Sequence, residues 1–303
     1  MSIASHVMMI RPNFVGQEDE LELDIGNANT PTLPISLWQE ALSELDLLQN
    51  QLRDSGIQVS VFQPSEGPIP LASAFSINWV SFHPQGDIIR YPIRTHSSKL
   101  KNQAEIIQEF LDRNAAWEFT DLREYRSVGV YLEGMGSVVL DRKGRIAYAC
   151  ESPNTHPGFF ERYCQYFEWK PIIFRANPLY KDSFAYTSSL LSVGEGFCIL
   201  CKEAIAEENR KEVLDTLAVA DKELIECNFD QMQQSACNLI QLQNTKGDRY
   251  IVLSEKAFQA LYPSQVSRLE SFGTLLPISL EVIGNLGVGG LCCILTEVFE
   301  PHS

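Results

Sequence analysis

Histidine is scarce in this sequence, and basic residues are few. The five histidines are scattered, and no HxH or HExxH spacing occurs, so the sequence gives no indication of a metal centre. Lys and Arg total 24 against 39 Asp and Glu, which gives a net charge of -15. Such a chain repels phosphates and anionic lipid, so neither nucleic acid nor a membrane is an expected partner.

Long apolar runs are also missing. No run approaches 18 apolar residues, which excludes a membrane-spanning helix, and the first fourteen residues lack the apolar core of a signal peptide. The composition of 45% apolar and 21% charged residues is that of a globular protein. The length of 303 residues allows one large domain or two small ones.

The eight cysteines lie in apolar runs rather than in turns, which indicates reduced thiols and a cytoplasmic location. Cys198 and Cys201 have the CxxC spacing of zinc and redox sites. They lie in the apolar run GFCILC, however, so we expect core packing there. We expect no metal or organic cofactor.

A repeat is visible in the turns. Glycine-bearing turns at 84–87, 141–144, 193–196 and 245–248 are each flanked by strand-like runs, and their starts are 57, 52 and 52 residues apart. Each reads as a β-hairpin. Runs of helical character follow the hairpins at 101–113, 157–167, 202–218 and 255–272. A closing strand then ends each unit, such as 171–176 or 223–227.

The two ends of the chain supply a fifth unit. Residues 290–299 read as a strand with no helix after it, whereas residues 6–12 read as a strand followed by a helix at 35–56 and a strand at 57–62. Joined around a ring, these segments complete five hairpin-helix-strand units. The alternative is an α+β sandwich with coincidental spacing. We favour the ring because the units repeat in order as well as in length.

Four local motifs resemble the pentein superfamily of guanidino-group-modifying enzymes, which includes arginine deiminases, amidinotransferases and dimethylarginine hydrolases. They occur in the expected order and are Asn78-Trp79 before VSFHPQGDIIRYPI, LEGMGS at 132–137 before VVLDRKGRIAYAC, LLSVG at 190–194, and GVGGLCCILTE at 287–297. The resemblance implies an α/β fold, a five-fold pseudosymmetric propeller that spans residues 1–303 as a single domain.

The resemblance also implies site residues. In this family a Cys thiolate attacks the guanidinium carbon, a His moves protons, and acidic residues hold the cation. Carried over, Cys293 falls on the nucleophile and Glu133 on an acidic residue, but Tyr186 stands where the family has His. Ala72 replaces an Asp, and Cys292 replaces the Arg before the nucleophile. Among the substrate-binding positions, Asn238 keeps an Asn, and Asn78 and Trp79 line or support the central cavity.

The implied reaction is therefore hydrolysis or transfer at a guanidino group, in impaired form, and the expected ligand is a guanidino compound or another small cation. Loss of the acid–base group and of one carboxylate lowers such a rate by roughly four to seven decades. One alternative is a catalytically inactive pentein scaffold that binds a small ligand or a protein partner. Another is a thiol-dependent enzyme in which His83, His96 or His156 supplies the missing base.

Arg90 and Arg94 stand near the end of a strand-like run. They could hold an anion, but we favour a solvated strand edge with an ion pair.

Overall fold

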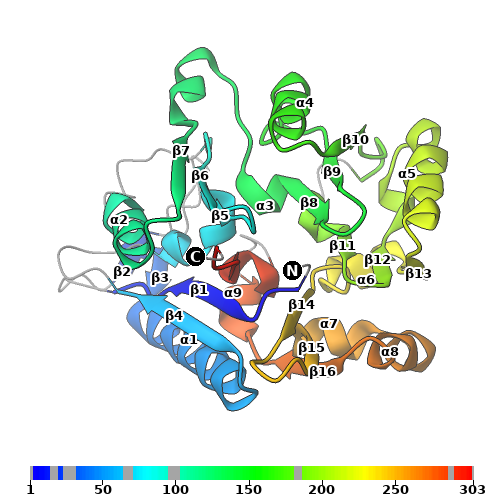
Figure 1. Ribbon diagram of the computed structural model, residues 1–303. Helices are drawn as coiled ribbons and strands as arrows, with labels where there is room; N and C mark the ends of the chain where they lie inside the picture. Colours follow the sequence, from blue (N-terminus) through cyan, green and yellow to red (C-terminus); the bar gives the residue numbers. More distant parts are fainter. Residues whose placement is uncertain are drawn as a thin grey trace.

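Five three-stranded sheets surround a central axis in this protein, and the helices lie on the outside (Figure 1). The structure is a computed structural model that describes residues 3–13, 20–22, 32–63, 71–94, 103–180, 186–285 and 290–301. The sheets are β17 (Thr296–Val298), β1 (His6–Ile10) and β4 (Gln58–Phe62); β5 (Val80–Phe82), β6 (Asp87–Arg90) and β7 (Glu118–Asp121); β8 (Val138–Asp141), β9 (Ile146–Cys150) and β10 (Lys170–Phe174); β11 (Leu191–Val193), β12 (Phe197–Leu200) and β13 (Glu223–Glu226); and β14 (Ile240–Gln243), β15 (Arg249–Ser254) and β16 (Thr274–Ile278).

Every sheet has the same topology. The middle strand pairs antiparallel with one neighbour and parallel with the other, as β6 does with β5 and with β7. The four predicted hairpins are confirmed, and their glycines serve the turns. Gly86, for example, has a φ of +99°, and a Cβ there would lie 2.7 Å from the carbonyl oxygen of Ala116. A small additional sheet pairs β2 (Glu20–Glu22) with β3 (Thr32–Pro34).

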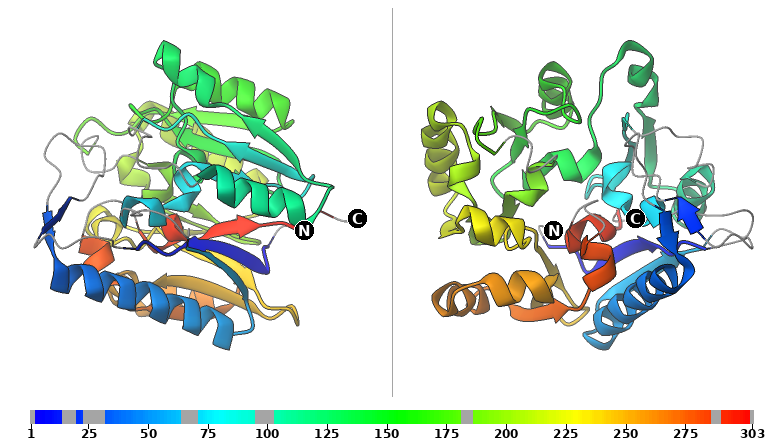
Figure 2. Two further views of the ribbon diagram at one scale, coloured as in Figure 1. Left: turned by 90° about the vertical axis from the view of Figure 1, so that its left-hand side faces the viewer. Right: turned by 180° about the vertical axis from the view of Figure 1, so that it is seen from behind.

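The first and last strands close the ring. β17 pairs antiparallel with β1, with His6 opposite Val298 and Met8 opposite Thr296, and β1 pairs parallel with β4. The turned views show β1 and β17 side by side (Figure 2). The expected fifth unit, assembled from the two ends of the chain, is therefore confirmed.

Helices connect the strands of each unit on the outside of the ring (Figure 1). These are α1 (Ile35–Asp54), α2 (Gln103–Arg113), α4 (Pro157–Tyr166), α5 (Glu207–Val219), and the pair α7 (Glu255–Ala260) and α8 (Pro263–Glu270). The run 255–272 was expected as one helix. It breaks because Pro263 cannot continue α7 and instead begins α8.

The run 290–299 also differs from expectation. Residues Leu291–Ile294 form a short 3₁₀ helix, and the strand begins only at Thr296. Cys292 and Cys293 are therefore not strand neighbours, and the alternation rule that would point their side chains to opposite faces does not apply. Cys198 and Cys201, by contrast, are fully buried in an apolar cluster, as expected.

The structure also bears on membranes and metals. None of the helices among the described residues is long and apolar enough to cross a membrane. The same residues contain no cluster of three or more His, Cys, Asp or Glu side chains arranged to hold a metal ion.

Candidate functional site

The sequence-predicted site residues come from equivalent places in the five units. Each unit places a short turn or helix immediately before its innermost strand, and these segments meet around the axis. The segments are Ser76–Asn78, α3 (Gly134–Ser137), Thr187–Ser189, the turn that follows α6 (Phe229–Gln233) and contains Asn238, and Leu291–Ile294. The site is thus a product of the pseudosymmetry, with one contribution from each unit.

Two glycines allow these segments to approach closely. A Cβ on Gly134, whose φ is +45°, would lie 2.1 Å from the carbonyl oxygen of Ile77. A Cβ on Gly136 would lie 2.3 Å from Oδ1 of Asn78 and 3.0 Å from the ring of Tyr186. The glycines of the LEGMGS motif are therefore required for packing, whatever the chemistry of the site.

Glu133 and Tyr186 are in direct contact. The Tyr186 hydroxyl donates a hydrogen bond of 2.6 Å to Oε2 of Glu133, and the backbone N–H of Arg94 donates to Oε1 over 2.9 Å. Glu133 is only 3% exposed. Burial raises the pKa of the carboxyl group, although the hydrogen bonds from Tyr186 and Arg94 oppose this shift.

Tyr186 links Glu133 to Asn78. Asn78 Nδ2 lies 3.4 Å from the Tyr186 hydroxyl, and Asn78 Oδ1 is buried without a partner among the described residues. Burial strongly raises the pKa of Tyr186, and the negative charges of Glu133 and Cys293 raise it further. A phenol in this position is a weaker acid than in water and keeps its proton at neutral pH.

Cys293 lies in a network built on Asn238. Its backbone N–H donates to the carbonyl of Gly290 over 3.0 Å, and the Cys292 N–H donates to Oδ1 of Asn238 over 3.1 Å. Asn238 Nδ2 in turn donates to the carbonyl of Ser188 over 3.0 Å. Asn238 therefore ties the thiol-bearing turn to the segment that follows Tyr186.

The pKa values of the two neighbouring thiols, Cys292 and Cys293, are shifted in opposite directions. A hydrogen bond from Cys292 lowers the pKa of Cys293, and contacts with Ser188 and Gly290 add to this effect against the cost of burial. The pKa of Cys292 is raised, first by its hydrogen bond to Cys293 and then by burial. Since the thiolate is the nucleophilic form of cysteine, Cys293 is the more activated of the pair. Cys293 is 1% exposed.

Ser188 is a residue that the sequence argument did not single out as a site residue. It lies two positions after Tyr186, and that position was the only available signal in the sequence. Ser188 and Cys292 also line a cavity of about 120 Å³ that extends along the axis to Arg142 and Lys222.

One expected site residue stands apart from this group, and another is described only by its backbone. Trp79 is 2% exposed and belongs to the apolar cluster around β5, β6 and α2, whereas Cys293 belongs to a different cluster. The structure therefore places Trp79 as a support of the segment that carries Asn78. Ala72 lies in a short 3₁₀ helix, Leu71–Ala74, of which the structure describes the backbone at this position, and its role stays a prediction.

The described histidines lie elsewhere. His83 is fully buried, hydrogen bonds to Ser81 over 2.8 Å and stacks on Phe167, and burial lowers its pKa well below the ordinary value. His156 caps α4 by accepting a hydrogen bond from the N–H of Phe159. Neither has a recorded contact with Cys293. His96 lies outside the described residues.

Comparison with known proteins gives one family match and several similar solved structures. Residues 34–300 match the model of the family described as "N,N dimethylarginine dimethylhydrolase, eukaryotic". No curated protein sequence matches this chain. The N-terminal domain of ArgZ, an arginine dihydrolase from the ornithine–ammonia cycle in cyanobacteria, solved as a cysteine-to-serine mutant bound to substrate, has a TM-score of 0.73 and 14% identity, with 98% of each chain covered.

Two further solved structures are similar. DDAH from Pseudomonas aeruginosa, a cysteine-to-serine mutant in complex with citrulline, has a TM-score of 0.63 and 14% identity, with 97% of this chain and 99% of that chain covered. Unliganded AgrE has a TM-score of 0.72 and 15% identity over all of this chain and 41% of its own.

At this level of identity the solved structures establish the fold alone. They confirm the five-fold pseudosymmetric α/β propeller expected from the sequence. The family match extends over most of the chain. The chain therefore belongs to the N,N dimethylarginine dimethylhydrolase family, eukaryotic type.

Proposed function

We propose that this protein binds a guanidino compound at Glu133 and presents it to Cys293, and that hydrolysis there is slow. The observation that carries the proposal is the position of Tyr186. Its hydroxyl is hydrogen bonded to Glu133, and its pKa responds to the charge of Cys293. Tyr186 is therefore in contact with the carboxylate that would hold a guanidinium and close enough to the attacking thiol to be affected by its charge.

Glu133 suits the binding of a guanidinium cation, and Cys293 suits the attack on its carbon. An ionised Glu133 would pair with a buried guanidinium, which accepts planar, charge-assisted hydrogen bonds to a carboxylate. The lowered pKa of Cys293 favours the thiolate, which would add to the planar carbon. Oε2 of Glu133 already accepts a hydrogen bond from Tyr186, so a guanidinium would either share that oxygen with the phenol or displace it.

Proton transfer is the weak point of the proposed reaction. The leaving amine needs a proton, and the water that completes hydrolysis must lose one. Tyr186 serves poorly in both steps because its pKa is raised far from neutral pH, where an efficient acid–base group titrates. The phenol therefore stays protonated. If no other group takes this role, turnover is lower by roughly 10²- to 10⁴-fold, and among the described residues neither His83 nor His156 lies in contact with Cys293.

A second candidate is a pentein scaffold that binds a small ligand without turnover. It is favoured by one specific observation, the hydrogen bond of 2.6 Å that engages Glu133 within the protein itself. In this case the Tyr186–Glu133 pair is a permanent structural element, and the ligand contacts other groups.

A panel of guanidino compounds separates the two candidates. The full chain would be incubated with arginine, agmatine, methylarginines and creatine, and ammonia, amine and ureido products would be measured beside a Cys293→Ser variant. Slow turnover that disappears in Cys293→Ser supports the hydrolase. A folded protein with no turnover, whose melting temperature still rises with one of these compounds, supports the binding scaffold.

Two broader statements belong to the same proposal. We propose that residues 1–303 form one domain, because the first and last strands share a sheet. We also propose that the protein works in the cytoplasm, because its eight cysteines are free and buried.

A further inference from the structure

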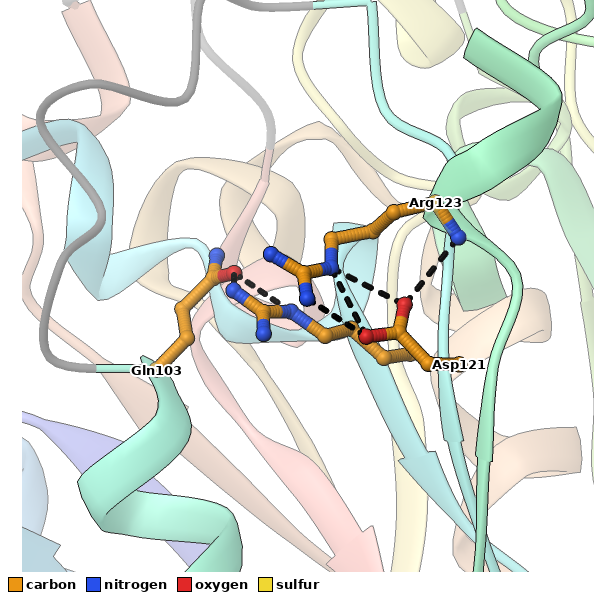
Figure 3. A network of polar contacts seen from close by, with 4 residues as sticks. Gln103, Asp121 and Arg123 are labelled. Atoms are coloured by element: carbon orange, nitrogen blue, oxygen red, sulfur yellow. Dashed lines mark hydrogen bonds and ion pairs between the residues drawn. The ribbon is translucent and has the colours of Figure 1, made fainter.

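Two clusters of polar side chains lie outside the proposed guanidinium site, and the first holds its own strand ends together. Arg90 ends β6 and is only 6% exposed, so the solvated strand edge favoured for it is wrong. Its Nε donates to Oε1 of Gln103 at the start of α2 over 3.0 Å. Asp121 at the end of β7 accepts hydrogen bonds of 2.9 and 2.6 Å from Nε and Nη2 of Arg123 (Figure 3). These contacts have a structural role.

The second cluster crosses the sheet that closes the ring. Ser60 on β4 is opposite Met8 on β1, and His6 lies two residues before Met8, on the same face of the sheet. His6 is in turn opposite Val298 of β17, and Glu300 follows two residues after Val298. The register of three adjacent strands therefore places Ser60, His6 and Glu300 in a row, in that order.

The side chains in this row are in direct contact. His6 Nε2 lies 2.9 Å from Oγ of Ser60, and His6 Nδ1 lies 3.3 Å from Oε1 of Glu300. An ionised carboxylate can only accept a hydrogen bond, so the neutral ring carries its proton on Nδ1. Nε2 is then left to accept a hydrogen bond from the serine hydroxyl. This is the tautomer in which a histidine can take a proton from a serine.

The surroundings of His6 favour its neutral form. The side chain is 10% exposed. Burial lowers the pKa of His6, the charge and hydrogen bond of Glu300 oppose this shift, and the positive charge of Arg113 adds to it. A general base must be unprotonated to act, and His6 meets this requirement at neutral pH.

A cation also contacts the serine. Arg113, at the C-terminal end of α2, donates from Nη1 to Oγ of Ser60 over 3.4 Å. Its guanidinium lies over the rings of Phe62 and Phe110, 5.6 and 5.4 Å from their centroids, and Nη2 pairs with Glu109. These contacts hold a charged donor close to the atom at which a carbonyl would be attacked. A donor of this kind stabilises the oxyanion that such an attack creates.

We propose that Ser60 and His6, with Glu300 as a positioning residue, form a second catalytic centre that hydrolyses small carboxylic esters. Oγ of Ser60 bonds to the carbonyl carbon while His6 takes the hydroxyl proton, and Arg113 stabilises the oxyanion. The bond to the alcohol oxygen breaks as His6 passes the proton to it. Water then attacks the acyl-serine, His6 takes a proton from the water and returns it to Oγ, and the acid is released.

The second centre is open to solvent and independent of the first. Ser60 is half-buried, and the side chains of Glu300 and Arg113 are 50% and 46% exposed. A substrate therefore approaches from the surface, which suits a small ester. Within the described part of the chain, none of these residues hydrogen bonds to Cys293. The proposal therefore stands whether or not guanidino compounds are hydrolysed.

Labelling of the full chain with an alkyl fluorophosphonate tests the proposal. The reagent should phosphonylate Oγ of Ser60 with loss of fluoride, and mass spectrometry should find the adduct on the peptide that contains Ser60. In His6→Gln, which has no base, the labelling rate should fall by about 10²-fold or more. Ser43→Ala is the matched control, because Ser43 is an exposed serine that donates to the carbonyl of Gln39, and it should change nothing.

Hydrolysis of p-nitrophenyl acetate gives a second readout, measured in a Cys293→Ser background so that this thiolate does not contribute. Ser60→Ala should lower kcat/KM by about 10²-fold or more. Glu300→Gln should lower kcat with little change in KM, because Glu300 acts through the orientation of the ring. Ser60→Ala removes a single hydroxyl, so it decides alone if His6→Gln fails to fold. Equal rates with and without the Ser60 hydroxyl, or no label on Ser60, would overturn the proposal.

Discussion

The hydroxyl of Tyr186 and the carboxylate of Glu133 are joined by a hydrogen bond of 2.6 Å inside the ring, where both groups are largely withdrawn from water. In this pair the phenol is the donor and the carboxylate the acceptor. The arrangement keeps Tyr186 neutral and gives Glu133 an internal partner. Both consequences can be tested by substitution.

Tyr186→His should raise the turnover of guanidino compounds by about 10²-fold or more, because imidazole titrates near neutral pH, whereas a phenol with a raised pKa does not. Tyr186→Phe is the matched control, since it removes the hydroxyl without supplying a base. Product formation over the same substrate panel measures both variants. Equal activity of the His and Phe variants would contradict the assignment of Tyr186 to the acid–base position.

The pH dependence of folding stability should reflect the raised pKa of Glu133. Burial raises its pKa in the folded state, so between the ordinary and the raised pKa the folded protein binds more protons than the unfolded chain. Stability from this group is therefore lost as pH rises through that window. Glu133→Gln should be more stable than wild type at pH 7, and the difference should vanish near pH 4 in urea unfolding. A variant less stable than wild type at pH 7 would count against this reading.

The acidity of Cys293 should depend on its neighbour. Cys292→Ala removes the thiol that lowers the pKa of Cys293, so alkylation of Cys293 by iodoacetamide at pH 7 should slow by about tenfold or more. Cys292→Ser keeps a hydrogen-bond donor and should retain most of the rate. Mass spectrometry of the peptide that contains Cys293 follows the reaction from pH 6 to 10. Identical rates in both variants would show that Cys292 has no such effect.

A buried ion pair should contribute strongly to folding. Lys222 Nζ lies 2.9 Å from Oδ1 of Asp141, and the two side chains are 2% and 1% exposed. Lys222→Met leaves a buried carboxylate unpaired and should reduce the free energy of unfolding by about 3–5 kcal/mol.

The double variant Lys222→Met/Asp141→Asn removes both charges and should recover a large part of that loss in denaturant titrations. The exposed pair of Arg175 and Glu208 serves as the reference, and its Arg175→Gln variant should lose less than about 1 kcal/mol. If Lys222→Met and Arg175→Gln lost similar amounts of unfolding free energy, the stronger effect expected for the buried pair would be contradicted.

The architecture could be predicted because its signals are local. Glycine turns such as the one at Gly86 recur at nearly constant spacing, and apolar periodicity marks the strands and helices between them. The break before Pro263 was missed because the apolar pattern continues across it. The 3₁₀ helix at Cys292 and Cys293 was missed because an apolar run is equally compatible with a strand.

The site was less predictable because its interactions are long-range. Motif comparison pointed to Glu133 and Tyr186, but their hydrogen bond joins residues 53 positions apart and cannot be read from either segment alone. The burial of Arg90 is a similar case. Its place near the end of a strand-like run indicated a solvated edge, whereas the covering group comes from Gln103 on the helix that follows. The distinction between a solvated and a buried arginine depends on that tertiary contact.

The pairing of β1 with β17 imposes an order on the assembly of the molecule. These strands are separated by nearly the whole chain, so this sheet is complete only when the last strand has met the first. Contacts of such long range are slow to form because loop closure must precede them. The turn that carries Cys293 immediately precedes β17. In a nascent or partly folded chain the turn that carries Cys293 is therefore not yet held by Asn238, and it takes its place only as the ring closes.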